Sequence, residues 1–202
     1  MQQITPVTRA LLFTNIGFFV LQSLTGPVLI GLFALWPPTS AQYPYAPSFE
    51  IWQLLTYGFL HGGLTHLLFN MLALYMFGSE IERLLGARRF LWYYLACIVG
   101  AAVTQLLVLG VMNTPPVPTV GASGGVFGLL LAFGLAYPHR TIMLVFPPIP
   151  MPAWVFVTLY GLLELYLGVT GSGQGIAHFA HLGGMMAGYL LLTHWARQRR
   201  TG

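Results

Sequence analysis

The chain has 202 residues, of which 56% are hydrophobic and only 6% are charged. Soluble domains carry about 25% charged residues, so this composition excludes an ordinary water-soluble domain and predicts a protein that lies in lipid. Eight arginines and four glutamates give a net charge of +4, and the chain has no lysine and no aspartate. Membrane proteins concentrate basic residues on their cytoplasmic side, which accounts for the basic excess, so no nucleic-acid partner is expected.

Six apolar segments approach the length of about 20 residues that a helix needs to cross a bilayer. They are Ala10–Leu35, Leu64–Phe77, Phe90–Met112, Ser123–Tyr137, Ala153–Gly168 and Ile176–Trp195. The second and fourth are short, which indicates helices whose ends are sheltered by neighbours. The predicted fold class is therefore an all-α membrane protein, a six-transmembrane-helix bundle that forms a single domain over residues 1–202.

The connecting segments differ in character. Residues 36–60 form a long loop with several prolines and aromatic residues, which is expected on the outer side between the first two spans. Pro147–Pro152 holds four prolines and must interrupt any helix there. Residues 196–202 read as a basic cytoplasmic tail.

The arginines predict the orientation of the bundle. With six crossings, all of them fall on one side of the membrane: Arg9, Arg83, Arg88, Arg89, Arg140, Arg197, Arg199 and Arg200. Cytoplasmic loops carry such an excess of basic residues, so both termini are expected in the cytoplasm.

Several polar residues interrupt the apolar spans, where they are costly and usually functional. The second span holds His66 and Asn70, which are four residues apart and share one helical face. The fourth span opens with Ser123 in a glycine-rich run, and the sixth holds His178 and His181. With the predicted orientation, all five lie at one depth, just below the outer surface.

These residue types together predict nucleophilic catalysis. A serine hydroxyl needs a base within hydrogen-bond reach, and histidine has a suitable pKa. With no aspartate in the chain, a complete Ser-His-Asp triad is excluded and a Ser123–His181 dyad is expected. The Ser123 backbone N–H at a helix start, together with His66 and Asn70, are candidate donors to an oxyanion. Phe127, one turn after Ser123, is placed to pack against the imidazole.

Four stretches of the sequence resemble the rhomboid family of intramembrane serine proteases, in its minimal six-helix bacterial form. They cover nearly the whole chain from the second span to the sixth: Gly121-Ala122-Ser123-Gly124; Ala180-His181-Leu182-Gly183-Gly184 continuing to Gly188; His61 to Asn70; and Phe77 to Gly86. One departure is visible, because rhomboids often carry Trp-Arg in the first outer loop, where this chain has Trp52-Gln53.

The resemblance implies a serine endopeptidase that cleaves transmembrane-helix substrates near the outer membrane face, in the inner (plasma) membrane of a bacterium. It implies Ser123 as nucleophile and His181 as base, and no cofactor or metal. Its partners would be transmembrane protein substrates and membrane lipids. The remaining implied site residues are the oxyanion or substrate-binding set His66, Asn70, Gly121 and Ala122, and a packing set near the site, Phe127, Gly124, Gly184, Gly188 and His178.

Other functions remain as alternatives to this interpretation. The main one is a non-proteolytic rhomboid-like protein that binds membrane clients, although such relatives lack the serine or the histidine. A zinc protease would have to use His66, His178 and His181, and the His-Glu-x-x-His motif is absent. The serine elbow of soluble hydrolases needs a preceding strand, which the proline-rich segment before Gly121 does not provide. A transporter would show internal repeats. Glu164 and His61 receive no role.

Overall fold

Helices make up nearly all of the regular structure, as the apolar segments predict. The computed structural model describes residues 3–38, 42–43, 45–112, 116–143, 147–171 and 177–201. In chain order the elements are α1 (Pro6–Thr25), α2 (Pro27–Phe33), α3 (Gln53–Thr56), η2 (Tyr57–Phe59), α4 (Leu64–Leu85), α5 (Ala87–Met112), α6 (Ser123–Ala136), β1 (Thr141–Met143), β2 (Pro150–Pro152), α7 (Ala153–Thr170) and α8 (His178–Thr201).

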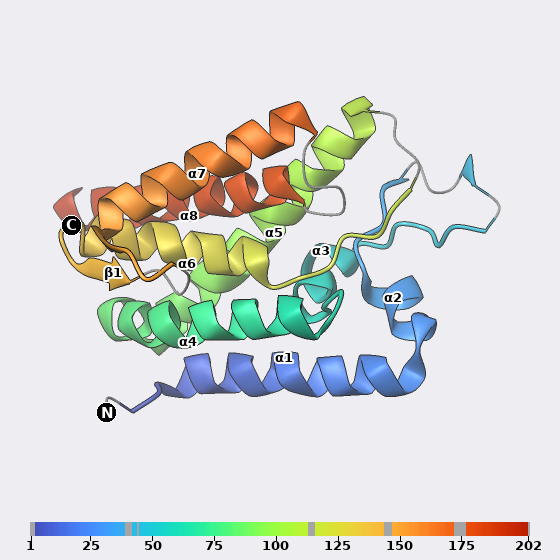
Figure 1. Cartoon of the computed structure of the whole chain (residues 1–202), viewed down its shortest axis with the longest axis horizontal. Helices are drawn as coiled ribbons and strands as arrows, with labels where there is room; N and C mark the ends of the chain where they lie inside the picture. The colour runs from blue at the N-terminus through green and yellow to red at the C-terminus, as the bar shows by residue number, and fades with distance from the viewer. Residues whose placement is uncertain are drawn as a thin grey trace.

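The predicted class, a helical membrane bundle, is confirmed. Six long helices, α1, α4, α5, α6, α7 and α8, correspond to the six predicted spans (Figure 1). Within the described residues, α1, α5 and α7 are long and apolar enough to cross a membrane. The apolar helix α6 has only 14 residues, whereas α4 and α8 have 22 and 24 residues and carry charged residues near their C-terminal ends.

The first predicted span, Ala10–Leu35, is wrong as one continuous helix. It is divided into α1 and α2 at Gly26, whose φ of 63° lies in the left-handed region. Pro27 follows and begins α2, because proline fits the first turn of a helix but cannot donate the hydrogen bond that would continue α1. Counting apolar residues along the sequence does not reveal this break, because Gly26 and Pro27 lie inside an apolar run.

Two other helices are longer than the apolar pattern predicts. The second span continues beyond Phe77 to Leu85, where Gly86 with φ 79° ends α4. Residues 196–201 continue α8 and are helical, where the sequence suggested a tail. The predicted start of the sixth span, Ile176, lies outside the described residues. The predicted helix break at Pro147–Pro152 is confirmed, because β2 pairs there antiparallel with β1 and α7 begins at once at Ala153.

The polar C-terminal end of α4 holds the start of α1. The Glu82 carboxylate accepts hydrogen bonds from the Thr5 hydroxyl at 2.5 Å, from the Val7 and Thr8 amides at 3.0 and 2.7 Å, and from the Thr8 hydroxyl at 2.9 Å. The first amides of a helix have no partner within it, so an anion placed there satisfies them and stabilises the end of the helix. This contact explains why Glu82 is buried and why α4 continues past the apolar run that ends at Phe77.

The segment between α2 and α4 is anchored by side chains. Gln53 is buried; its Oε1 accepts from the Trp36 amide at 3.1 Å, and its Nε2 donates to the carbonyls of Leu32 and Ser48 at 3.4 and 3.2 Å. The indole of Trp52 also donates to the Leu32 carbonyl, at 3.0 Å. The Trp52-Gln53 pair, which departs from the family pattern, therefore links this segment to the end of α2.

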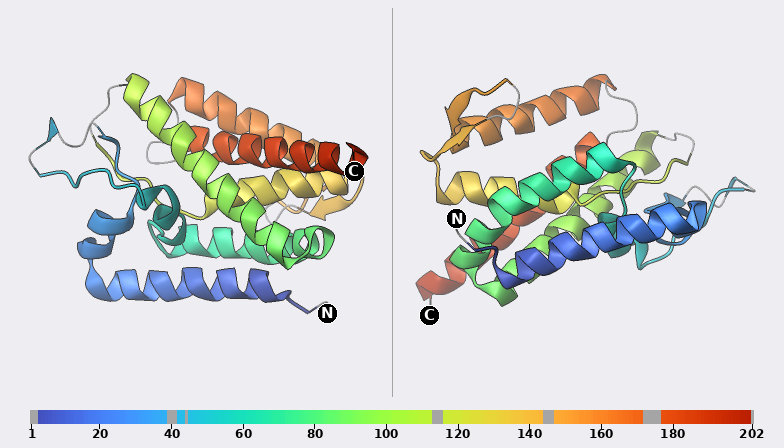
Figure 2. Two further views of the ribbon diagram at one scale, coloured as in Figure 1. Left: turned by 180° about the vertical axis from the view of Figure 1, so that it is seen from behind. Right: turned by 60° about the horizontal axis from the view of Figure 1, so that its bottom comes forward.

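Helix α6 lies at the centre of the bundle, with α4 on one side and α7 and α8 on the other (Figures 1 and 2). Ten of its 14 residues are buried. Glycines allow the close packing: a Cβ at Gly184 of α8 would clash with the backbone of Gly124 in α6, and one at Gly128 would clash with the Cys97 sulfur of α5. Small residues permit such approaches between membrane helices.

The two chain ends lie together at one end of the bundle, with β1 and the turn between α4 and α5 (Figure 1). Seven arginines with described side chains belong to segments at this end, namely Arg9, Arg83, Arg88, Arg89, Arg140, Arg197 and Arg199. Helix α6 begins on the opposite side and starts short of the level that α1 and α5 reach. Ser123, its first residue, is thus recessed among the neighbouring helices.

Candidate active site

The start of α6 is shaped by Gly121. This residue has φ 131°, a conformation that favours glycine, and its amide donates to the Tyr57 carbonyl at 3.0 Å. Ala122 is completely buried and caps the helix, with its carbonyl accepting from the Val126 amide at 3.1 Å. The turn presents Ser123 at the first position of α6, with its hydroxyl directed toward α8.

Ser123 and His181 are in direct hydrogen-bond contact. The Ser123 Oγ and the His181 Nε2 are 2.8 Å apart, although 58 residues separate them in the sequence. The backbone contact between Gly124 and Gly184 lies next to both residues, so the glycine pair brings α6 and α8 close enough for the side chains to meet. This is the geometry that a serine nucleophile and its base require.

The His181 imidazole is also held by aromatic stacking. Its ring lies on Phe127, with centroids 4.2 Å apart and planes within 6° of parallel. Phe127 in turn stacks on Tyr160 of α7, at 5.2 Å and 9°, and Tyr160 stacks on Phe156, at 5.4 Å and 21°. A continuous aromatic stack therefore connects α8, α6 and α7.

His66 of α4 approaches the same place from the other side of α6. A Cβ added to Gly121 would lie 2.7 Å from the His66 Cε1 and 3.7 Å from the Ser123 Oγ, so the His66 ring fills the space beside Gly121 and next to the serine. Asn70 is buried, and its side-chain amide donates to the His66 carbonyl at 2.9 Å, within α4. The structure thus brings His66 beside the Ser123–His181 pair, while Asn70 bonds its own helix.

His61, which has no predicted role, is buried beside His66, with ring centroids 5.2 Å apart. Within the described part of the chain, neither of its ring nitrogens has a hydrogen-bond partner. Burial, and to a lesser extent the neighbouring His66, lowers the pKa of His61 to about 4. His61 is therefore a neutral imidazole at physiological pH.

Sequence reasoning gave no role to Glu164, which lies in the middle of α7. Its Oε2 accepts from His181 Nδ1 at 2.8 Å and from His178 Nδ1 at 2.7 Å, and the carboxylate is buried. One feature of the sequence does indicate a role for Glu164: it is a single acid inside an apolar span, and such an acid is rarely tolerated without a partner. The partner itself depends on how α7 is rotated against α8, and residue spacing does not determine that angle.

Within the described ranges, one cluster combines three residues of types that bind metal ions: Glu164, His178 and His181. His66, which the zinc alternative requires, does not belong to it. Two ligands on a tetrahedral zinc ion lie roughly 3.3 Å apart, given metal–ligand bonds of about 2.0 Å. The separations of 2.7 and 2.8 Å here are hydrogen-bond distances, so the three side chains are arranged to share protons.

The other glycine singled out near the site faces α5. A Cβ at Gly188 would clash with the Tyr93 hydroxyl and would lie 3.1 Å from the Cys97 sulfur. Gly188 therefore allows α8 to pack on α5 and does not contact Ser123.

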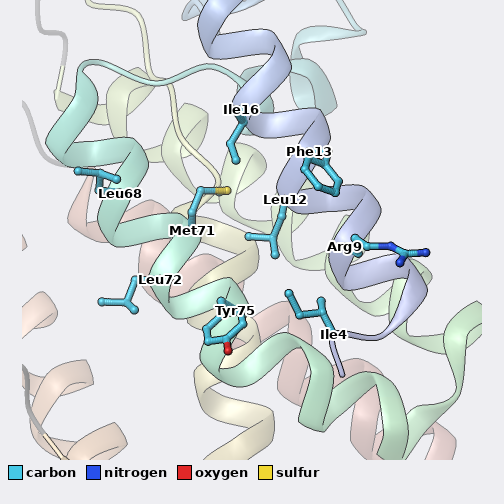
Figure 3. A pocket seen from close by; sticks show the side chains of 9 residues that line it. All are labelled: Ile4, Arg9, Leu12, Phe13, Ile16, Leu68, Met71, Leu72 and Tyr75. Carbon is cyan, nitrogen blue, oxygen red and sulfur yellow. The ribbon is translucent and has the colours of Figure 1, made fainter. Parts of the chain in front are cut away.

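A cavity of about 430 Å³ lies apart from these residues, between α1 and α4 (Figure 3). Its walls are apolar except for Arg9 and the Tyr75 hydroxyl, and they are formed by Ile4, Arg9, Leu12, Phe13, Ile16, Leu68, Met71, Leu72 and Tyr75. None of the predicted site residues lines it, so it is separate from the serine–histidine pair.

Comparison with known proteins agrees with this arrangement. The family model of the Rhomboid domain matches residues 48–198. The chain belongs to the rhomboid family. The match begins before α3 and ends in α8, so it includes Ser123, His181 and the residues around them.

Named rhomboid proteins from three organisms are similar to the chain. Rhomboid protein 1, mitochondrial, of Saccharomyces cerevisiae is 35% identical over 133 residues, which are 65% of this chain and 38% of that protein. Rhomboid protease GluP of Bacillus subtilis is 32% identical over 141 residues, 69% of this chain and 25% of that protein. Rhomboid protease GlpG of Yersinia pestis is 28% identical over 197 residues, 96% of this chain and 63% of that protein. The chain thus spans less than two thirds of each relative's length.

Proposed function

We propose that this rhomboid-family chain is an intramembrane serine endopeptidase that cleaves transmembrane-helix substrates near the outer membrane face, with Ser123 as nucleophile and His181 as base. The supporting observation is the 2.8 Å contact between the Ser123 Oγ and the His181 Nε2, inside a bundle of membrane helices. Family membership gives the same activity class, because GlpG and GluP are named as rhomboid proteases.

The reaction follows from the positions of these groups. His181 Nε2 takes the hydroxyl proton as the Ser123 Oγ bonds to the carbonyl carbon of the scissile peptide, and it then gives that proton to the leaving amine. Water hydrolyses the acyl-enzyme by the same proton transfers. The Ser123 amide, at the start of α6, and the His66 ring are the nearest donors for the oxyanion, and Asn70 joins them if its amide turns from the His66 carbonyl.

The substrate helix reaches Ser123 from the side, between α4 and α7, which flank α6. Both helices expose apolar side chains to the surroundings, such as Leu68 and Leu72 on α4 and Leu159 and Leu162 on α7. In this proposal the substrate end unwinds near the outer surface, and an extended segment meets the serine. The family resemblance adds a small residue before the cut and a helix-breaking residue nearby.

The orientation and location belong to the same proposal. The chain ends and the arginine-bearing segments lie at one end of the bundle, which supports cytoplasmic termini. The inner membrane of a bacterium is proposed from the family resemblance alone. Ser123 then lies on the outer side. The chain acts as one membrane domain on transmembrane proteins, without a cofactor.

The test uses purified protein in liposomes with a single-span reporter substrate. The wild type should cleave the reporter and react with a fluorophosphonate probe, whereas Ser123→Ala and His181→Ala should do neither while remaining folded. Chelators should leave the rate unchanged. Cleavage by Ser123→Ala would rule out the serine mechanism, and a folded wild type that binds the reporter without cleaving it would favour client binding.

A further inference from the structure

Glu164 is the one charged residue of α7, a helix of 18 residues that is otherwise apolar or uncharged. Its side chain is only 6% exposed. A carboxylate removed from water is strongly unfavourable unless charged or hydrogen-bonding partners compensate for the lost hydration. The reaction proposed above makes no use of this group, so its position inside the bundle needs a separate explanation.

The carboxylate determines which nitrogen of His181 carries the proton. An ionised carboxylate only accepts hydrogen bonds, so the 2.8 Å contact with Glu164 Oε2 requires a proton on His181 Nδ1. In the neutral ring Nε2 is then the unprotonated nitrogen, and it faces the Ser123 hydroxyl at 2.8 Å. This is the tautomer that a general base for Ser123 must have.

We propose that Glu164 is a positioning residue for His181, and that the two form a Ser123–His181–Glu164 relay in which the third member comes from α7. The inference rests on the protease function proposed above. When His181 takes the Ser123 proton on Nε2, the ring becomes a cation with protons on both nitrogens. Glu164 stays ionised and stabilises that cation until the Nε2 proton passes to the leaving amine.

His178 holds the carboxylate in this position. It lies three residues before His181 on the same face of α8, and its Nδ1 donates to the same Oε2 at 2.7 Å. Both imidazole side chains are buried, with exposures of 5% for His178 and 11% for His181. Two donors on one oxygen compensate for its lost hydration and prevent the carboxylate from turning away from His181.

The experiment compares Glu164→Gln and Glu164→Asp with the wild type in liposomes, and uses Glu80→Gln as the matched control, because it makes the same change in α4 beside Arg83 and Arg140. A glutamine amide offers a donor where an acceptor is needed and favours the wrong tautomer. We expect Glu164→Gln to lower kcat by about 10²- to 10⁴-fold, with KM within about threefold of the wild type, since no substrate contact is removed. Fluorophosphonate labelling should slow to a similar degree.

Glu164→Asp keeps the charge and should recover at least about tenfold of the lost kcat. The control Glu80→Gln should stay within about twofold of the wild type. A folded Glu164→Gln protein with wild-type kcat and labelling rate would overturn the inference. So would equal losses in the Gln and Asp variants, because a merely structural role would not discriminate between them.

The tautomer can also be measured directly in the wild type, which avoids variants that fail to fold. With ¹⁵N-labelled histidine, the nitrogen shifts of His181 should show the proton on Nδ1; a proton on Nε2 would overturn the inference. The two proposals fail in different ways. A wild type that neither cleaves nor labels disproves the protease function, whereas a reactive wild type with an equally reactive Glu164→Gln variant disproves only the role of Glu164.

Discussion

The imidazole of His181 lies flat against the ring of Phe127, with their centroids 4.2 Å apart and their planes 6° from parallel. Because Phe127 is on α6 and is itself buried, the ring fixes the plane in which His181 presents Nε2 to Ser123. Hydrogen bonds to Glu164 and Ser123 fix the direction within that plane. Together these contacts leave the His181 imidazole with one orientation.

The first prediction concerns this stacking. Aromatic pairs contribute about 0.5–1.5 kcal/mol beyond burial, and each 1.4 kcal/mol of barrier is about tenfold in rate, so Phe127→Leu should lower kcat by roughly two- to tenfold. Steady-state cleavage of a reporter in liposomes measures this. Phe127→Tyr should retain most of the rate. Phe156→Leu, at the far end of the aromatic stack, is the matched control and should have little effect; an equal loss there would assign the effect to general packing.

The second prediction concerns the glycine contact between α6 and α8. A methyl group on residue 184 would clash with the Gly124 backbone, so Gly184→Ala should force the helices apart, lower the unfolding free energy by about 1–3 kcal/mol and reduce cleavage by more than tenfold. Unfolding in detergent micelles and reporter cleavage measure the two effects. Gly17→Ala is the control, because a Cβ there meets nothing within 4 Å and alanine favours a helix. Similar behaviour of both variants would contradict the packing argument.

The third prediction concerns the attachment of α1 to α4. Glu82→Gln replaces a carboxylate that accepts four hydrogen bonds, and hydrogen bonds to charged groups contribute about 1.5–3 kcal/mol, so the unfolding free energy should fall by about that amount. Chemical unfolding in micelles provides the measurement. Glu80→Gln, two residues earlier, breaks half-exposed ion pairs with Arg83 and Arg140 and should change stability by less than about 1 kcal/mol. The reverse ranking would disprove the anchoring role.

The fourth prediction is a pH dependence that originates at His61. Its pKa is about 4 in the folded protein, below the ordinary value of 6.5, so the unfolded state binds the proton more tightly. Stability should therefore be at its full value above pH 6.5, decrease as the pH falls from 6.5 to 4, and level off below that. A shift of this size corresponds to a loss on the order of 3 kcal/mol.

Unfolding curves at several pH values, with the wild type and His61→Leu in parallel, isolate the contribution of His61. The variant keeps the other titrating groups, so the difference between the two stability profiles should show the decrease between pH 6.5 and 4. A difference that does not change with pH would mean that His61 is protonated equally in both states.

Much of this arrangement follows from the sequence, because depth in a membrane is encoded along the chain. Apolar runs predict helices, the arginines predict which ends lie together, and helices of alternating direction then place Ser123, His66 and His181 at one level. The glycines at 124 and 184 indicate that α6 and α8 approach closely. Residue spacing along the chain and the periodicity of a helix are sufficient to predict these features.

The parts that sequence reasoning missed depend on rotation about helix axes and on local backbone geometry. Glu164 is recognisable as an unusual acid, but only the rotation of α7 directs it to His181. Asn70 has the depth of an oxyanion donor, yet its amide bonds the His66 carbonyl one turn earlier. The division at Gly26 and the helical extension to Leu85 arise from a positive φ and from the Glu82 contacts, which an apolar count does not detect.

Helix α7 contributes both Tyr160 of the aromatic stack and Glu164 of the hydrogen-bonded group, whereas Ser123 and His181 belong to α6 and α8. Any outward tilt of α7 that leaves the other two helices in place must pull a carboxylate and an aromatic ring away from the imidazole together. Entry of a substrate helix beside α7 would therefore separate His181 from Glu164 until α7 moved back. In the proposed reaction, peptide cleavage would then begin only after α7 had moved back, so substrate entry and bond cleavage would be separate, consecutive steps.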